Sequence, residues 1–417
     1  MMIKTLRGMK DILPDEIGIW QYVENAAKEL FELFGYREIR TPILEETSLF
    51  VKGIGEGTDI VQKEMYSFKD KGGRRISLRP EGTAPVVRSY LENNLNKKEA
   101  LVKLYYIGPM FRSERPQAGR QRQFHQMGIE VIGSDSFYVD AEVIYLMKAY
   151  FDRIGLAGYT IKINTLGCSK DKTGIKKELT RFLKDKTNLL CKDCKVRYKK
   201  NILRIFDCKV EGCKALLRSA PKIIDAICGD CKDHFANLKK TLESLKVDYV
   251  VDPYIVRGLD YYTKTAFEAT HPNLGSQDAI CAGGRYDNLV RDTGGSKTGA
   301  CGFAIGQDRL IMALGSKRES EKALDLYVAV LGEVPYKEGF RLCNGLRING
   351  VSSDMDYQNR SLKAQMRQAN RRGAKYVAIL GEDELQKDVI ILRNMADGQQ
   401  REIKINNFID EVKKLKC

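Results

Sequence analysis

Apolar residues recur at helical spacing along residues 17–34, which predicts an amphipathic helix. Gly35 follows, and a glycine after the last turn takes positive φ without strain, so we expect the helix to end there. Residues 36–41 then alternate as a strand does. This strand stops at Pro42, which has no N–H for a central ladder, so we place it at a sheet edge or an interface.

The stretch 111–130 (FRSERPQAGRQRQFHQMGIE) follows an apolar strand pattern at 101–110. Its middle, residues 113–122, is polar and rich in Gly, Pro and Arg, which is typical of a loop. The pattern therefore predicts a β-hairpin with a basic tip. Guanidinium groups gathered this closely suit phosphate better than a packed core, although a solvated basic loop is the alternative. The arginines concerned are Arg112, Arg115, Arg120 and Arg122.

Side chains alternate between the two faces of the second strand of this hairpin. One face is apolar and is predicted to be the core face. The other face carries, in order, Phe124, Gln126, Gly128 and Glu130. We expect a small polar ligand to lie in the gap that the glycine leaves between the amide and the carboxylate.

Three further stretches carry polar residues in apolar surroundings. RPEGT (79–83) lies between a predicted strand at 75–78 and a predicted helix at 84–94, where the helix dipole favours the anionic Glu81, although a plain helix cap is the alternative. Residues 256–267 (VRGLDYYTKTAF) predict a strand, and residues 300–310 a strand that turns into a helix. Arg257 and Arg309 need anionic partners in such settings.

Strands alternate with helices from residue 325 to the end, which predicts a parallel or mixed α/β sheet. The charged stretch SKRESEK (316–322) is the predicted linker before it. The formal net charge of the 417 residues is +15. Residues 168–249 hold much of this excess, with 21 Lys and Arg against 11 Asp and Glu. A polyanion partner and a solvated lysine-rich surface both explain such a segment.

No apolar run approaches the roughly 18 residues of a membrane span, and the first residues lack the apolar core of a signal peptide. We therefore expect a cytoplasmic protein. Its 11 cysteines are then expected to be reduced thiols or metal ligands rather than disulfides.

Two cysteine pairs in the basic segment have the spacing of zinc knuckles, Cys191-x2-Cys194 and Cys228-x2-Cys231. The 33 residues between the pairs exceed the usual interval of about 15 to 20. Two interpretations stay open: a structural zinc site made by these four cysteines, or reduced thiols inside a helical insertion. Cys208, Cys213 and His234 lie in the same segment.

A helix, a strand ending in proline, and then a hairpin with FRSER resemble motifs one and two of the class II aminoacyl-tRNA synthetases. RPEGT, VRGLDYYTKTAF, AGGRYDNLV and GFAIGQDRL narrow the resemblance to histidyl-tRNA synthetases of the bacterial type. The resemblance implies an α+β fold, an antiparallel sheet flanked by helices, with a helical insertion and a C-terminal α/β anticodon-binding domain. The implied domains are a catalytic core (1–167 and 250–318), the basic insertion (168–249) and the anticodon-binding domain (323–417).

The resemblance also implies a ligase that activates L-histidine with ATP and transfers it to the 3′ end of tRNA(His), working as a homodimer with Mg²⁺ on the ATP phosphates. The residues implied for histidine are Glu81, Thr83, Arg112, Gln126, Glu130, Arg257, Tyr261 and Tyr262. Those implied for ATP are Arg112, Glu114, Arg120, Phe124 and Arg309. Arg112 and Arg257 would be catalytic, and Arg115 and Gln117 would contact tRNA.

Three positions depart from the family pattern, Ser113, Gln121 and the pair Gln307–Asp308. Other functions also remain open. The main alternative is a noncatalytic paralogue that binds histidine and regulates a histidine-biosynthetic enzyme. Another synthetase of the same subgroup and a nucleic-acid-binding protein without activity are the others.

Overall fold

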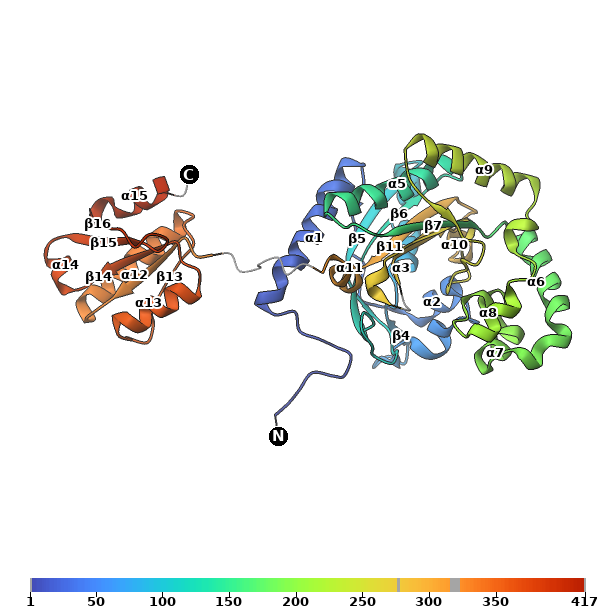
Figure 1. Cartoon of the computed structure of the whole chain (residues 1–417), viewed down its shortest axis with the longest axis horizontal. Coiled ribbons are helices and arrows are strands. Elements are labelled where there is room, and N and C mark those ends of the chain that lie inside the picture. Colours follow the sequence, from blue (N-terminus) through green and yellow to red (C-terminus); the bar gives the residue numbers. More distant parts are fainter. Residues whose placement is uncertain (1, 276–277, 316–322, 416–417) are drawn as a thin grey trace. The chain divides into compact units, whose positions relative to one another are not determined.

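The computed structural model describes residues 2–275, 278–315 and 323–415, so the predicted linker 316–322 lies outside the described residues. The chain divides into two compact units, one made of residues 1–12 and 19–317 and the other of residues 13–18 and 318–417. Each unit has its own sheet (Figure 1).

An eight-stranded sheet forms the centre of the first unit. Its internal pairings are antiparallel, and only the pairs at its two ends are parallel, which confirms the predicted antiparallel sheet. The strand after the first helix lies at the sheet edge, as its terminal proline predicts. The order is β1 (Arg37–Glu38), β5 (Val102–Phe111), β6 (Gln123–Ile132), β11 (Ala300–Gly306), β10 (Ala279–Arg285), β9 (Thr263–Thr270), β7 (Thr160–Thr165) and β8 (Val250–Val251).

Helices α1 (Pro14–Leu33) and α5 (Phe137–Arg153) cover one face of this sheet (Figure 1). The ring of Phe31 on α1 contacts Tyr105 of β5, Tyr150 of α5 and Phe303 of β11. The predicted first helix is confirmed, and it begins three residues earlier than its apolar pattern, at Pro14, because proline suits the first turn of a helix. This face holds the core, as the alternation in β6 predicts.

The opposite face carries a three-stranded sheet and two helices. The small sheet has the order β2 (Leu44–Glu46), β4 (Arg75–Leu78), β3 (Ser67–Lys69). The helices are α2 (Thr47–Ile54) and α3 (Thr83–Glu92). The strand predicted at 75–78 and the helix after RPEGT are both confirmed, and RPEGT connects them above the central sheet.

The strand predicted for residues 256–267 is partly wrong, because β9 begins only at Thr263. Residues 256–262 form a loop. Tyr261 and Tyr262 are consecutive and both are buried. In a strand, consecutive side chains point to opposite faces, so one of the two would be exposed if one face met solvent. The backbone N–H of Asp260 donates to the carbonyl of Ile54, so the loop is held against α2 instead of extending the sheet.

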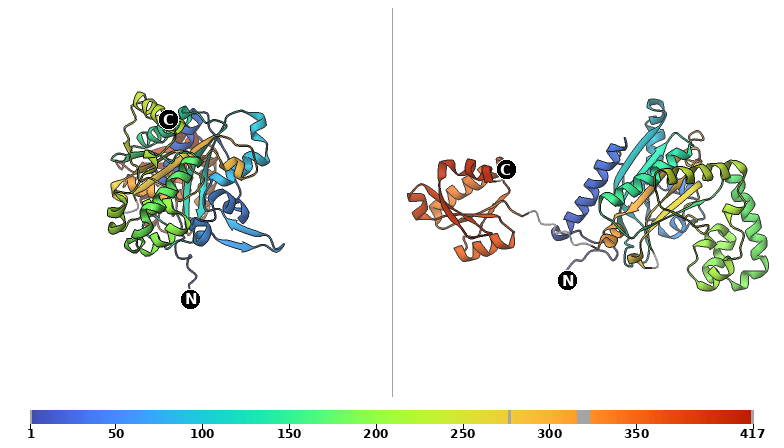
Figure 2. Two further views of the ribbon diagram at one scale, coloured as in Figure 1. Left: turned by 90° about the vertical axis from the view of Figure 1, so that its right-hand side faces the viewer. Right: turned by 45° about the horizontal axis from the view of Figure 1, so that its top comes forward.

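Residues 169–244 are mostly helical and belong to the first unit. Figures 1 and 2 place their first helices at the end of the unit away from α1. Leu179, Leu183 and Ile205 share one hydrophobic cluster with Val87 and Tyr90 of α3, so the core is continuous. The helices are α6 (Ser169–Leu183), α7 (Lys192–Lys200), α8 (Glu211–Leu217) and α9 (Gly229–Ser244).

The second unit is a five-stranded mixed sheet with helices, as predicted. The order is β13 (Ser353–Met355), β12 (Leu326–Val330), β14 (Tyr376–Leu380), β15 (Val389–Asn394), β16 (Gln400–Lys404). The longer helices are α12 (Glu333–Ile348), α13 (Leu362–Arg371) and α15 (Phe408–Leu415). The sequence pattern missed β16 and the short α14 (Glu382–Gln386), because both are short and mostly charged.

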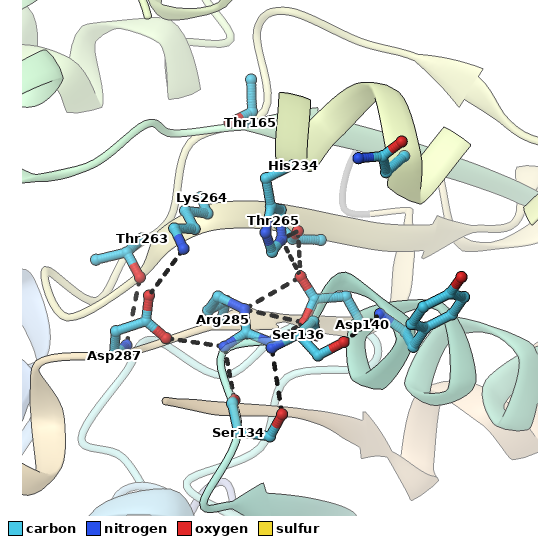
Figure 3. Close-up of polar contacts among 12 residues, drawn as sticks. Ser134, Ser136, Asp140, Thr165, His234, Thr263, Lys264, Thr265, Arg285 and Asp287 are labelled. Carbon is cyan, nitrogen blue, oxygen red and sulfur yellow. Dashed lines mark hydrogen bonds and ion pairs between the residues drawn. The ribbon is translucent and has the colours of Figure 1, made fainter. Parts of the chain in front are cut away.

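A buried polar network joins the sheet to two helices (Figure 3). Arg285 of β10 and Asp140 of α5 are fully buried, and Nη2 of the guanidinium lies 2.5 Å from Oδ1 of the carboxylate. His234 of α9 and Thr265 of β9 bond to Oδ2 of the same carboxylate. Burial alone would raise the pKa of Asp140, but the Arg285 charge and these bonds outweigh it and lower the pKa to about 2.

We predict that Asp140→Asn lowers the free energy of unfolding by roughly 3 kcal/mol, because buried Arg285 would keep only one of its two carboxylate partners, Asp287. The Asp140 pKa lies below its unfolded value, so this loss is full above pH ~4 and shrinks as the pH falls toward 2. Urea denaturation at several pH values measures it. Asp292→Asn removes an exposed ion pair with Arg291 and serves as the control. Equal losses in the two variants would contradict the prediction.

Candidate active site

A cavity opens on the sheet face opposite α1 and α5. Its walls come from the hairpin β5–β6, the start of α3, the loop before β9, and strands β10 and β11 with α11 (Gln307–Leu314). Eleven of the residues predicted to bind substrates line it. These are Glu81, Thr83, Arg112, Glu114, Arg120, Phe124, Gln126, Glu130, Tyr261, Tyr262 and Arg309.

Arg257, Arg115 and Gln117 do not line this cavity. Arg257 lines an adjoining cavity, which shares the walls formed by Arg112, Glu114 and Arg120. Arg115 and Gln117 are exposed in the hairpin tip, where the Gln117 backbone pairs with that of Arg120. The structure therefore gathers the predicted residues into one cavity, one neighbouring cavity and one exposed tip.

Glu130 lies at the closed end of the cavity and is 1% exposed. Thr83 Oγ1 donates to one of its carboxylate oxygens at 2.7 Å, and the Tyr286 hydroxyl donates to the other. Burial raises the pKa of Glu130 to about 8, against the opposing effect of these two hydrogen bonds. The backbone of β11 approaches closely here, since a Cβ on Gly302 would collide with the carboxylate.

Glu81 caps helix α3. Its oxygens accept the backbone N–H groups of Thr83 at 2.7 Å and Ala84 at 2.9 Å. Burial raises the pKa of Glu81, and these two bonds oppose the rise. The Thr83 hydroxyl at the same helix start donates to Glu130 and not to the helix backbone. Thus the dipole of α3 faces a carboxylate that also lines the cavity.

Gln126 has a buried side-chain oxygen with no hydrogen-bond partner in the described part of the chain. Buried polar atoms in native proteins nearly always have a partner. Gln126 lines the cavity between the carboxylate end and the arginines. An amide acceptor kept unpaired in this position is suited to a hydrogen-bond donor on a ligand.

The expected ligand gap over Gly128 is wrong, because the ring of Tyr106 fills it. Tyr106 stands opposite Gly128 in the hairpin, and a Cβ on this glycine would lie 2.5 Å from the tyrosine hydroxyl. Sequence reasoning missed Tyr106 and Tyr286 as cavity residues. The hairpin register could have found Tyr106, since residues 106 and 128 share a face. Tyr286 lies in the motif AGGRYDNLV, but its contact with Glu130 joins residues far apart in the sequence.

Three guanidinium groups lie at the other end of the cavity. Arg112 donates to the carbonyl of Pro80 at 2.9 Å and lies 5.1 Å from the ring centroid of Phe124. Arg120 pairs with Glu114 at 2.8 Å. Arg309 donates to the carbonyls of Gly119 and Ala279, and burial and the neighbouring Arg120 lower its pKa. These contacts aim fixed positive charge at one place, which suits a polyphosphate.

Arg257 is held by an anionic partner, as its apolar setting predicted. Its Nη1 lies 3.3 Å from a carboxylate oxygen of Glu268, and Nη2 donates to the carbonyls of Phe267 and Gly283. The side chain is 8% exposed, and its Nε has no partner in the described chain. Asp308, one of the departures from the family pattern, accepts the backbone N–H of His125 at 3.0 Å.

The zinc site predicted from Cys191, Cys194, Cys228 and Cys231 is wrong as a set. The structure places Cys191 and Cys194 with Cys208 and Cys213, and it places Cys228 and Cys231 with Cys168 and Asp171. The two knuckles are therefore in different clusters. His234 bonds to Asp140 and belongs to neither cluster.

We predict that Glu130→Gln stabilises the fold at high pH, because the folded state no longer holds a buried carboxylate. The folded pKa of about 8 lies above the unfolded value near 4.5, so wild-type stability falls as the pH rises between them. The advantage of the variant should grow by about 1.4 kcal/mol per pH unit over this range and level off above it. Urea denaturation at pH 5, 7 and 8.5 measures it, with Glu99→Gln at an exposed ion pair as control. A pH-independent difference would refute the assignment.

Comparison with known proteins covers nearly the whole chain. The family model described as Histidyl-tRNA synthetase matches residues 8–310, and the one described as Anticodon binding domain matches residues 325–415. The "Histidine--tRNA ligase" of Thermodesulfovibrio yellowstonii is 48% identical over 415 residues, which is 99% of both chains. That of Thermosipho melanesiensis is 49% identical over 405 residues, which is 96% of both.

A solved structure is similar in fold as well as in sequence. The crystal structure of apo S. aureus histidyl-tRNA synthetase is 37% identical, with a TM-score of 0.83, and the match covers 99% of this chain and 100% of that one. Among the described residues, no helix is long and apolar enough to cross a membrane.

Proposed function

The chain belongs to the histidyl-tRNA synthetase family, and from that premise we propose that it is a histidine–tRNA ligase. It would join the carboxylate of L-histidine to the α-phosphate of ATP with release of pyrophosphate. It would then transfer the histidyl group to a hydroxyl at the 3′ end of tRNA(His) with release of AMP. The observation that carries this proposal is a single cavity, closed by Glu130 at one end and lined by three arginines at the other.

The closed end would take the amino acid. Glu130 and Tyr262 would hydrogen-bond the two imidazole nitrogens, with Tyr261 supporting the ring. The unpaired oxygen of Gln126, together with Glu81 and Thr83, would accept from the α-ammonium. A site with polar partners for both ring nitrogens rejects apolar amino acids strongly, because they would leave buried polar groups unpaired.

The open end would take ATP. Arg112 would contact the α-phosphate and the substrate carboxylate, and Arg120 and Arg309 the γ-phosphate, with Phe124 stacking on adenine. Negative charge grows at the α-phosphate as the mixed anhydride forms. Cations already fixed by carbonyl and carboxylate contacts stabilise that charge without reorganising, an effect worth several kcal/mol in a water-shielded site, roughly 3 or more.

Arg257 would complete the charge around the α-phosphate. It adjoins the cavity, and its Nε is unpaired in the described structure. The Arg257 guanidinium now contacts Glu268 and the carbonyls of Phe267 and Gly283. To reach the phosphate it would break some of these contacts and form new ones with the substrate.

Mg²⁺ would enter with the ATP. It binds through one or two carboxylates plus substrate phosphates, and Glu114 is the cavity carboxylate beside Arg112 and Arg120. The residues therefore fit a magnesium ion that the nucleotide largely holds. The ion would neutralise charge on the β- and γ-phosphates, and Glu114 would orient it.

The remaining parts would bind tRNA. Arg115 and Gln117 in the exposed tip would contact the acceptor end, and the second unit, whose sequence matches an anticodon-binding domain, would bind the anticodon. We keep the domain division 1–167 with 250–318, 168–249 and 323–417, and place the enzyme in the cytoplasm. A noncatalytic regulatory paralogue would not need the second unit or the Arg257 loop, and this chain has both.

The test is ATP–pyrophosphate exchange and tRNA charging with each of the twenty amino acids. We expect histidine alone to support both reactions. Glu130→Gln should lower kcat/KM for histidine by roughly 10²-fold or more, because the imidazole loses its carboxylate partner. The same variant should remain folded, which separates binding loss from unfolding. Charging with another amino acid, or none with any, would overturn the proposal.

We further propose that the protein forms a homodimer. Two features of the structure support this proposal. The edge strand β1 has only two residues, and the sequence on either side of it leaves apolar side chains exposed, Leu33 at 75%, Ile43 at 42% and Leu44 at 45%. Sedimentation velocity at micromolar concentration should give about twice the chain mass of 47.3 kDa. Leu44→Lys should shift the population toward monomer. A wild-type protein that sediments only as a monomer would refute the dimer.

A further inference from the structure

Four cysteines of the helical segment point to a metal site that the proposed function does not use. We propose that Cys191, Cys194, Cys208 and Cys213 bind one zinc ion through four thiolates. Their sulfur atoms all lie within 4.8 Å of one another. Cys194, Cys208 and Cys213 are buried at 0%, 6% and 1% exposure, so the sulfurs face inward together.

The sulfur spacing matches a tetrahedral zinc centre. Zinc–thiolate bonds of about 2.3 Å place neighbouring sulfurs of a tetrahedron about 3.8 Å apart. The sulfurs of Cys191 and Cys208 lie 3.8 Å apart. A disulfide needs about 2.05 Å, and the ten described cysteines are all free thiols. The geometry therefore suits a shared ion rather than a covalent bond.

Backbone N–H groups point at three of the four sulfurs. The N–H of Cys191 donates to Cys213 Sγ at 3.2 Å, that of Cys194 to Cys191 Sγ at 3.5 Å, and that of Val210 to Cys208 Sγ at 3.4 Å. Donors aimed at sulfur stabilise the thiolate, which is the form that binds metal. A cluster of neutral buried thiols has no need of this arrangement.

The local sequence makes two knuckles. Cys191 and Cys194 flank the start of α7, and Cys208 and Cys213 flank the start of α8. The helices at the knuckles are short, since α7 has nine residues and α8 has seven. Such short elements hold together poorly by packing alone, and structural zinc supplies folding free energy in small modules of this kind.

Zinc is the metal that fits the site best. A closed set of four thiolates in tetrahedral arrangement suits zinc or an iron–sulfur centre. Neither aminoacyl transfer nor adenylate formation changes an oxidation state. A redox-active metal would therefore have no role in the proposed reaction. Magnesium is excluded by its preference for oxygen ligands.

The second cluster, Cys168, Asp171, Cys228 and Cys231, has an explanation without metal. The oxygens of Asp171 accept the backbone N–H groups of Cys168 and Cys228, both at 3.0 Å. This carboxylate thereby joins the start of α6 to the start of α9. Cys228 is also exposed. We therefore assign the zinc to the four-cysteine cluster and use the second cluster as the matched control.

The zinc site would stabilise a contact with the candidate active site. Between the knuckles, Asn201 donates to Asp260 at 2.5 Å, and Arg204 pairs with Asp59 at 2.7 Å. Asp260 directly precedes the two cavity tyrosines, Tyr261 and Tyr262. Zinc in this place would act on structure and would hold the loop that positions these rings.

The experiment measures metal in the full-length protein purified without chelator. Mass spectrometry of metals should find about one zinc per chain, and X-ray absorption at the zinc edge should find four sulfur ligands at about 2.3 Å. Cys194→Ser combined with Cys208→Ser should lose the zinc. Cys228→Ser combined with Cys231→Ser should keep it.

Three results would overturn the proposal: no stoichiometric metal in the wild type, iron in place of zinc, or a zinc shell that contains oxygen and is lost with Cys228 and Cys231. The absorption measurement uses the wild-type protein, so it decides the ligand set even if the Cys194 and Cys208 variant fails to fold. Histidine activation by the wild type is assayed on the same sample, so failure of the zinc site and failure of the proposed function are told apart.

Discussion

The buried ion pair between Arg285 and Asp140 is the contact on which the first unit depends most. It joins β10 to α5, and through His234 it ties the last helix of the inserted segment to the sheet. Two unexposed charges are tolerated only with such complete pairing, since an unpaired partner would cost several kcal/mol, roughly 3–5. The inserted segment is thus anchored at its return point, on the opposite face of the sheet from the cavity.

The cavity shows the opposite balance, in which stability is given up for binding. No ion pair joins buried Glu130 to a cation among the described residues, and burial raises its pKa to about 8 because the charged form is costly there. Gln126 has a buried side-chain oxygen that finds no partner in the part of the chain that the structure describes. Polar groups that lack a hydrogen-bond partner in the free protein make binding selective, because only a ligand with matching polar groups can pair with them. The arginines at the other end avoid this cost, because carbonyls and Glu114 hold them in place.

Local patterns predicted much of the scaffold. The hairpin and its faces followed from alternation, and the helix Pro14–Leu33 from helical spacing. Eleven of the cavity residues could be named through the family motifs. The pattern failed at residues 256–262, because long-range contacts of Asp260 and the two tyrosines replaced a ladder there. The sequence pattern also did not predict that Tyr106 fills the space above Gly128, because this contact joins two different strands.

The sequence by itself determined the periodicities, the turn positions and the cysteine spacings, because these depend on residues close together along the chain. The tertiary structure alone decided which distant residues meet. It set Tyr286 on Glu130, and it paired the knuckle of Cys191 with that of Cys208 rather than with that of Cys228. Two identical CxxC spacings contain no information about partners. The packing of α7 against the residues before α8 decides which cysteines are partners. Burial and the length of chain between the knuckles then determine which sulfur atoms come together.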